Sequence, residues 1–90
     1  MDFKQTFKQN VKKILETLPL SGLVVEFDLV DGTRVVPIVT SDDFEKMDEG
    51  QRQRIVWQKL LDELDPYEQT RVEFVHTMAP SEYQPAHDEP

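Results

Sequence analysis

Residues 23–40 read LVVEFDLVDGTRVVPIVT, and this stretch decides the fold. Its first eight residues alternate in the pattern of a strand with one buried face. That face would carry Val25, Phe27 and Leu29. Asp31-Gly32 is typical of a tight hairpin turn, because glycine accepts a positive φ without steric cost. Residues 33–40 are therefore predicted to form the returning strand.

Pro37 stands in the middle of that returning strand. It has no N–H group and must break one hydrogen bond of a ladder. We therefore expect a bulge, or an early end to the pairing of the two strands, at this residue. The register of the hairpin stays open at this stage.

A helix is predicted before the hairpin. Apolar side chains recur at the spacing of one helical stripe, at Phe3, Phe7, Val11, Ile14, Leu15 and Leu18. Asp2 and Gln5 have the spacing of a capping box, and Pro19 ends the segment. The lysines of this segment would lie on the other side of the helix.

A second helix is predicted after the hairpin. Residues 41–44 favour a short helical turn, and residues 48–51 repeat the capping-box spacing. Asp65-Pro66 ends the helix. Its buried stripe would contain Trp57, Leu60, Leu61 and Leu64, flanked by Ile55 and Val56.

Residues 70–78 predict a third strand. We expect Val72, Phe74 and His76 on its inward face and Arg71, Glu73 and Val75 on the other face. Residues 80–83 favour one more helical turn, and the polar, proline-containing residues 84–90 are predicted to be a disordered tail.

These elements predict an α/β (α+β) two-layer sandwich formed by one domain, residues 1–83. The order is helix, strand, strand, helix, strand and short helix. Because a strand-helix-strand crossover joins parallel strands, the third strand should run parallel to the second, while the hairpin strands are antiparallel. The result is a three-stranded mixed sheet with two main helices on one face.

Composition restricts the classes of partner. The chain has 18 acidic and 10 basic residues, a net charge of -8 and no cysteine. This charge opposes binding to nucleic acids and anionic membranes at long range. A candidate polyanion patch remains at Lys4, Lys8, Lys12 and Lys13, although a solvated helix face is the favoured interpretation. We expect a cytoplasmic monomer or weak dimer without a membrane span.

No residue constellation predicts an enzyme. The two histidines, His76 and His87, do not have metal-binding spacing, and the three glycines stand apart from one another. The carboxylates within residues 42–49 lack the spacing of a calcium loop and suit a solvated helix start. We expect no catalytic residues and no metal ligands.

Two stretches resemble the BolA family. The first is VTSDDFEKM, residues 39–47, leading into QRQRIV, residues 51–56. It is similar to the family's strand ending in Val-Ser, its Phe-Glu-Gly turn and its Gln-Arg-His-Arg helix start. The second is HTMAPSEY, residues 76–83, similar to the family's closing strand and its Thr-Pro-Glu-Glu-Trp type ending. The resemblance covers residues 3–83 and implies a fold related to the type II KH domain.

This resemblance implies a monothiol glutaredoxin as partner and a shared two-iron two-sulfur cluster. Counting back from Tyr83, however, Arg71 occupies the position of the family's ligand histidine. A guanidinium has no lone pair to give to iron. His76 lies five residues farther on, about 16 Å along a strand. We therefore expect no cofactor and no ligation of a cluster.

The family surface that remains predicts a partner-binding site at Gln51, Arg52, Gln53, Arg54, Arg71 and His76. Its arginines would dock a carboxylate-rich patch or a phosphate, or else neutralise neighbouring acids. The predicted function is a non-enzymatic protein-interaction module. A KH-like regulator that binds nucleic acid is the alternative, although the chain contains no Gly-x-x-Gly clamp.

Overall fold

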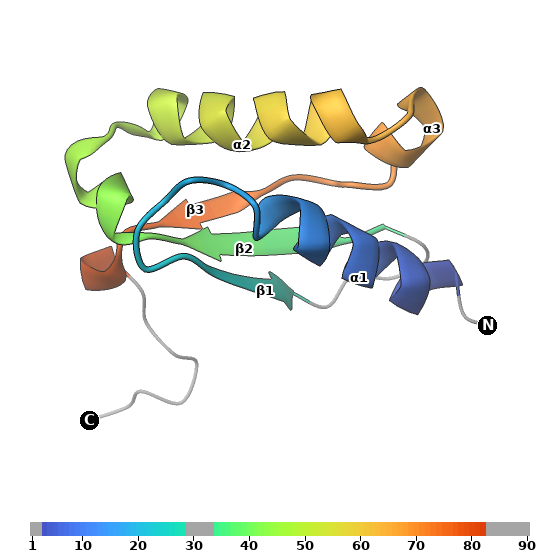
Figure 1. The fold of residues 1–90 in the computed structure, drawn as a ribbon, viewed down its shortest axis with the longest axis horizontal. Helices are drawn as coiled ribbons and strands as arrows, with labels where there is room; N and C mark the ends of the chain where they lie inside the picture. The colour runs from blue at the N-terminus through green and yellow to red at the C-terminus, as the bar shows by residue number, and fades with distance from the viewer. Residues whose placement is uncertain (1–2, 29–33, 83–90) are drawn as a thin grey trace.

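The computed structural model describes residues 3–28 and 34–82 of the protein. Their order confirms the predicted fold class (Figure 1). The elements are α1 (Phe3–Leu15), β1 (Val24–Asp28), β2 (Val36–Thr40), the 3-10 turn η1 (Asp42–Lys46), α2 (Glu49–Glu63), α3 (Pro66–Gln69), β3 (His76–Met78) and the 3-10 turn η2 (Pro80–Glu82). The short helix α3 was not predicted. None of the helices in this part of the chain has the length and apolar character that a membrane span needs.

The strands form one sheet in the order β1-β2-β3. β1 and β2 are antiparallel and β2 and β3 are parallel, as the crossover rule predicts. The β1–β2 register runs without interruption from Val24 opposite Thr40 to Asp28 opposite Val36, and it pairs Phe27 with Pro37. The expected bulge or early end of this pairing at Pro37 is therefore wrong.

Pro37 instead faces β3 with its backbone nitrogen. Val35 donates its N–H to the Arg71 carbonyl over 2.8 Å and accepts from the Glu73 N–H over 2.9 Å, so both its backbone groups point toward the third strand. Backbone groups of a strand alternate in direction, and Pro37 lies two residues farther on. The missing N–H therefore interrupts the ladder with β3 and leaves the hairpin intact.

An extra residue lies in the third strand at this interruption. Val35 forms a bridge with Val72, and Ile38 pairs with His76. Three steps along β2 thus correspond to four steps along the partner segment, which is the definition of a bulge. The regular strand β3 begins only after this irregular segment, residues 73–75.

The bulge reverses the predicted orientation of the last strand. Val75 is 4% exposed and Thr77 is 7% exposed, so both point toward the helices. Phe74 is 47% exposed, and His76 is half-buried on the side of the sheet that the helices leave uncovered. The prediction that Phe74 and His76 face inward is wrong, because one inserted residue inverts the alternation that follows it.

α1 and α2 cover the same face of the sheet, and one hydrophobic core fills the space between these layers. The first helix follows the prediction, with Ile14 half-buried and the other described apolar positions buried. The core contains Phe7, Val11, Leu15, Leu18, Val25, Val35, Val39, Phe44, Val56, Leu60, Leu64, Val72, Val75 and Ala79. The predicted cap at Asp2, the turn at Asp31-Gly32 and the tail lie outside the described residues.

The buried stripe of α2 is rotated from the predicted one. Its buried positions are Arg52, Val56 and Leu60, spaced by four residues, and the cap residue Leu64 continues this spacing. Leu61, predicted to be buried, is 52% exposed. The predicted buried stripe did not include Arg52, because arginine is a polar residue. Without this position, the predicted stripe is centred on Trp57 and Leu61 in place of Val56 and Leu60.

Two capping boxes fix the helix starts. The Asp48 carboxylate accepts from the Gln51 N–H over 2.8 Å and the Gln51 side chain accepts from the Asp48 N–H, as predicted. Asp65 and Glu68 repeat this exchange at the start of α3, where Pro66 occupies the first helical position. The second box was readable in the sequence, although Asp65-Pro66 was interpreted only as a stop.

Candidate functional site

Arg52 is the most enclosed of the predicted partner-binding residues, since its side chain is only 8% exposed. Its Nε donates to the Met47 carbonyl over 3.1 Å and its Nη2 donates to the Phe44 carbonyl over 2.6 Å. Nη1 and Nη2 also bind the two Glu82 carboxylate oxygens at 2.7 and 3.0 Å. Nη1 lies 3.5 Å from the Thr77 carbonyl. Arg52 therefore fastens η1, β3 and η2 to α2.

Glu82 is held in its ionised form by this contact. The hydrogen bond from Arg52 lowers the pKa of the Glu82 carboxyl to about 2, assisted by the Ala79 N–H, which donates to it over 3.0 Å. The same hydrogen bond raises the pKa of the guanidinium. Glu82 was not among the predicted residues, because thirty positions separate it from Arg52 and no local pattern joins them.

Gln53 covers the outer edge of β3. Its Nε2 donates to the Val75 carbonyl and to the Glu49 carboxylate, both over 2.8 Å. Its Oε1 accepts from the Trp57 indole N–H over 3.1 Å. The Thr77 hydroxyl lies 3.0 and 2.9 Å from the two Glu49 carboxylate oxygens. Side chains of α2 thus satisfy the carbonyls that β3 turns away from the sheet.

Arg54 differs from Arg52 although only two positions separate them. It is exposed, and no hydrogen bond or ion pair joins it to another residue in the described ranges. Arg54, Trp57 and Leu61 are spaced three and four residues apart, so they share one side of α2. Gln51, the remaining predicted residue on this helix, is exposed and serves the capping box.

Arg71 follows α3, which lies at the C-terminal end of α2, whereas Arg52 and Arg54 belong to the first turns of α2 (Figure 1). Its guanidinium carbon lies 5.1 Å from the centre of the Tyr67 ring, in the range of a cation–π contact. The structure therefore does not gather the three predicted arginines into one cationic cluster.

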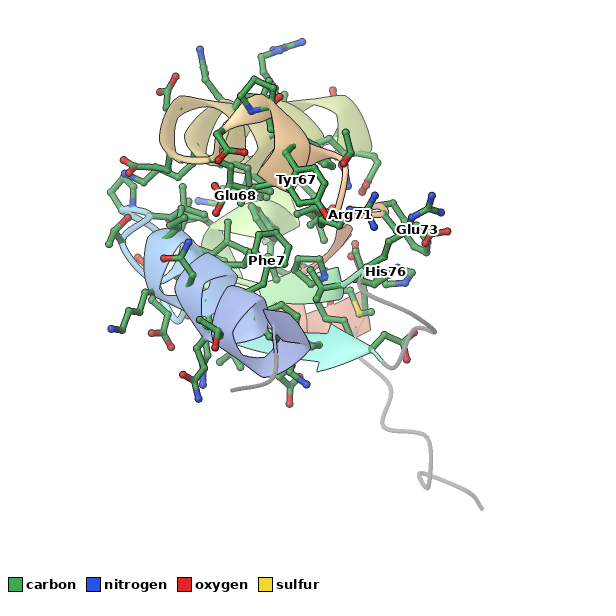
Figure 2. The ribbon with its side chains drawn as sticks, turned by 90° about the vertical axis from the view of Figure 1, so that its right-hand side faces the viewer. Phe7, Tyr67, Glu68, Arg71, Glu73 and His76 are labelled. Carbon is green, nitrogen blue, oxygen red and sulfur yellow. The ribbon has the colours of Figure 1, made fainter. Side chains whose placement is uncertain are left out.

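Exposed aromatic and aliphatic side chains occur on α2, on α3 and in the segment that leads into β3. Tyr67 is 60% exposed, and the Phe74 and His76 rings pack edge to face at 4.9 Å. Figure 2 shows Tyr67 close to Arg71, with Glu73 and His76 beyond Arg71. We call this surface the aromatic edge and define it by Trp57, Leu61, Tyr67, Phe74 and His76. The sequence predicted only His76 of these residues for binding, because the exposure of Phe74 depends on the bulge and that of Leu61 on the rotation of α2.

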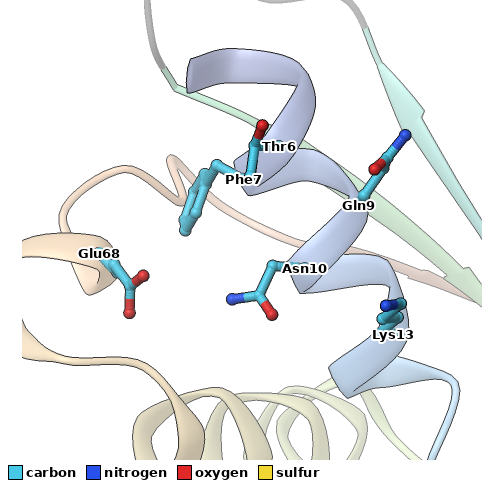
Figure 3. Close-up of a pocket in the computed structure, with 6 residues that line it drawn as sticks. All are labelled: Thr6, Phe7, Gln9, Asn10, Lys13 and Glu68. Atoms are coloured by element: carbon cyan, nitrogen blue, oxygen red, sulfur yellow. The ribbon is translucent and has the colours of Figure 1, made fainter. Parts of the chain in front are cut away.

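The predicted lysine patch is divided by the fold. Lys8 lies near β1, with its Nζ 5.7 Å from the centre of the Phe27 ring, and Lys12 forms an exposed ion pair with Glu16 at 3.8 Å. Lys13 instead borders a hollow of about 290 Å³ between α1 and α3 (Figure 3). The side chain of Lys4 lies outside the description.

That hollow between α1 and α3 suits a polyanion poorly. Thr6, Phe7, Gln9, Asn10, Lys13 and Glu68 line it. The Glu68 carboxylate would repel a phosphate chain bound to Lys13, and one of its oxygens already caps α3. Among the residues that the structure describes, no three histidine, aspartate or glutamate side chains are grouped as metal ligands.

Comparisons with known proteins identify a protein of similar fold. No protein-family model matches the chain, and a search of curated protein sequences gives no match. The chain is similar in structure to BolA1 from Arabidopsis thaliana, with a TM-score of 0.51 and 23% sequence identity over 93% of this chain and 99% of that chain. The chain therefore has a BolA-like fold, which agrees with the resemblance found in its sequence.

Proposed function

We propose that the protein is a non-enzymatic interaction module of BolA type that binds a protein partner through the aromatic edge. The observation that carries this proposal is the exposure of large apolar side chains there, with Leu61, Tyr67 and Phe74 between 47% and 60% exposed. Aromatic side chains beside arginines are enriched among the residues that dominate binding energy. Arg54 and Arg71 stand at the two ends of this surface.

The surroundings of the aromatic edge support a preformed surface. Gln53 binds the Trp57 indole N–H, and Arg52 reaches the Thr77 carbonyl of β3 over 3.5 Å. Side chains held in one conformation lose little entropy when a partner binds. We therefore assign a supporting role to Arg52 and Gln53, and we assign contact with the partner to the exposed residues.

The family resemblance makes a monothiol glutaredoxin the first partner to test. We propose that any such complex forms without a cluster ligand from this chain. Arg71, at the position of the family's ligand histidine, carries a permanent charge and stacks on Tyr67. The donor set near it therefore does not fit an iron-sulfur cluster. His76 packs edge to face against Phe74 on the uncovered side of the sheet.

Titration of the ¹⁵N-labelled protein with a monothiol glutaredoxin tests this proposal. Amide shifts should concentrate in α2, α3 and residues 71–76. The double variant Leu61→Ala, Tyr67→Ala should weaken binding at least tenfold, because each change removes an exposed apolar contact. The matched controls Gln58→Ala and Asp62→Ala change exposed residues of the same helix and should bind as the wild type does.

Two results would contradict the proposal. Shifts scattered over the whole surface, or equal affinity of the double variant and its controls, would remove the aromatic edge as the binding surface. Visible absorbance of a cluster in the wild-type complex that is lost when Arg71 is changed to Ala would show that this chain participates in ligation.

A further inference from the structure

β1 forms the second edge of the sheet, and its outward backbone groups have no partner among the described residues. Val36, Ile38 and Thr40 face β1, because the residues that alternate with them face β3. The remaining β1 residues, Val25 and Phe27, consequently turn their N–H and C=O groups away from the sheet. No hydrogen bond to these groups from another described residue is found.

A hollow lies on each side of this open edge. The outer hollow, about 330 Å³, is lined by Gly22, Val24, Glu26, Thr40 and Pro80. The inner hollow, about 310 Å³, lies between α1 and β1 and is lined by Lys8, Gln9, Lys12, Val25, Glu26 and Phe27. Successive side chains of an added strand point to opposite faces of a sheet, so each hollow would receive alternate side chains.

The charges on the two sides of the edge are opposite. The outer side has the exposed side chains of Val24, Glu26 and Asp28. The inner side has the Lys8 ammonium group, 5.7 Å from the centre of the Phe27 ring, and is bordered by Lys12, which is paired with Glu16. A strand that matches both sides carries basic and apolar side chains toward the outer face and acidic side chains toward α1.

We propose that β1 accepts an extended segment of a partner protein as a fourth strand, with lysine or arginine opposite Glu26, an apolar residue opposite Val24, and glutamate or aspartate beside Lys8. Backbone hydrogen bonds to Val25 and Phe27 would supply binding energy, and the alternating charges would select the segment. This surface lies at the other edge of the sheet from the aromatic edge and does not depend on the proposed function.

A second copy of this chain is a poor occupant of the same edge. Antiparallel pairing of two β1 strands about their middle residue would place Glu26 opposite Glu26. Like charges directly opposite in a sheet are destabilising, and each molecule has a net charge of -8. The charge pattern therefore favours a basic segment from another protein.

The probe is a synthetic peptide of roughly nine residues, a length typical of strands. It alternates lysine and glutamate through its middle, ends in two valines, and is blocked at both ends by acetyl and amide groups. Titration into the ¹⁵N-labelled protein should shift the amides of β1 and slow hydrogen exchange of the Val25 and Phe27 amides. A peptide of the same composition in scrambled order, with lysine on both faces, should bind more weakly.

The variant Glu26→Lys should weaken binding of the peptide about threefold to tenfold, since an attractive cross-strand pair becomes repulsive. Asp62→Lys makes the same change of charge at an exposed position on α2 and should have the smaller effect. Absence of shifts in β1, equal effects of the two variants, or self-association of the free protein through β1 in sedimentation would overturn the proposal. Because the shifts fall in β1 and not at the aromatic edge, the result is independent of glutaredoxin binding.

Discussion

The two edges of the sheet are finished in different ways. At the β3 edge, Gln53 and Arg52 donate hydrogen bonds to the outward carbonyls of Val75 and Thr77. At the β1 edge, the outward groups of Val25 and Phe27 have no such donors or acceptors in the described parts of the chain. Unpaired strand edges invite pairing with other chains. The comparison indicates that side chains of α2 close the β3 edge, whereas the backbone groups of the β1 edge stay open among the described residues.

The largest expected effect comes from removal of the Arg52 side chain, which joins η1, β3 and η2 to α2. Arg52→Ala removes the donors that serve Met47, Phe44 and Glu82, and leaves the buried Phe44 carbonyl with only the Met47 N–H as donor. We expect a loss of about 2 to 4 kcal/mol in the free energy of unfolding, measured by urea denaturation. Arg54→Ala, two positions away and exposed, should change it by less than about 0.5 kcal/mol. Equal losses would mean that burial does not distinguish the two arginines.

A smaller loss should follow from Gln53→Ala. This change leaves the Val75 carbonyl and the Trp57 indole N–H without their partner. We expect a loss of about 1 to 2 kcal/mol and faster hydrogen exchange in β3. Gln58→Ala, on the exposed side of the same helix, is the control. Unchanged exchange in β3 would show that the edge does not need this amide.

Acid should weaken the contact between Arg52 and Glu82 at the end of β3. The pKa of Glu82 is lowered from 4.5 to about 2, so its ionised form contributes stability above pH 4.5 that is lost as the pH falls toward 2. In Glu82→Gln this contribution is missing at every pH, although the amide oxygen still accepts a hydrogen bond. The wild type should be more stable than Glu82→Gln at neutral pH. The difference between their urea midpoints should narrow as the pH falls from 4.5 to 2. A constant gap would contradict the coupling to Arg52. Glu63→Gln changes an exposed carboxylate and is the control.

The smallest effect is expected at the open edge. Val24 is 49% exposed on β1, so Val24→Lys should change the free energy of unfolding by less than about 0.5 kcal/mol. Its neighbour Val25 is 5% exposed, and Val25→Ala should cost about 2 kcal/mol through lost burial and a cavity. Thermal denaturation of both variants measures this contrast. A large loss in Val24→Lys would indicate that the outer side of β1 is already covered.

Local patterns predicted the elements of this fold, because capping residues and alternation act over a few positions. The Asp48–Gln51 box and the strand order are examples. The orientation of His76 was not predictable by alternation, since it depends on an inserted residue that lies across from Pro37 on the neighbouring strand. The role of Arg52 depends on Glu82, which is distant in sequence. The sequence therefore could not predict the role of each side chain, and the predicted binding residues stay a prediction.

The extra residue between Val72 and His76 makes the side chains exposed along β3 sensitive to the length of the chain before this strand. Removal of a single residue from positions 73–75 would turn the imidazole toward the helices and the Thr77 hydroxyl toward solvent, and Glu49 would lose its hydroxyl partner. Deletion of one residue here thus changes which side chains are exposed along the whole of β3, whereas a substitution changes a single side chain. Insertions and deletions in this segment would therefore change the exposed surface along β3 more abruptly than substitutions would.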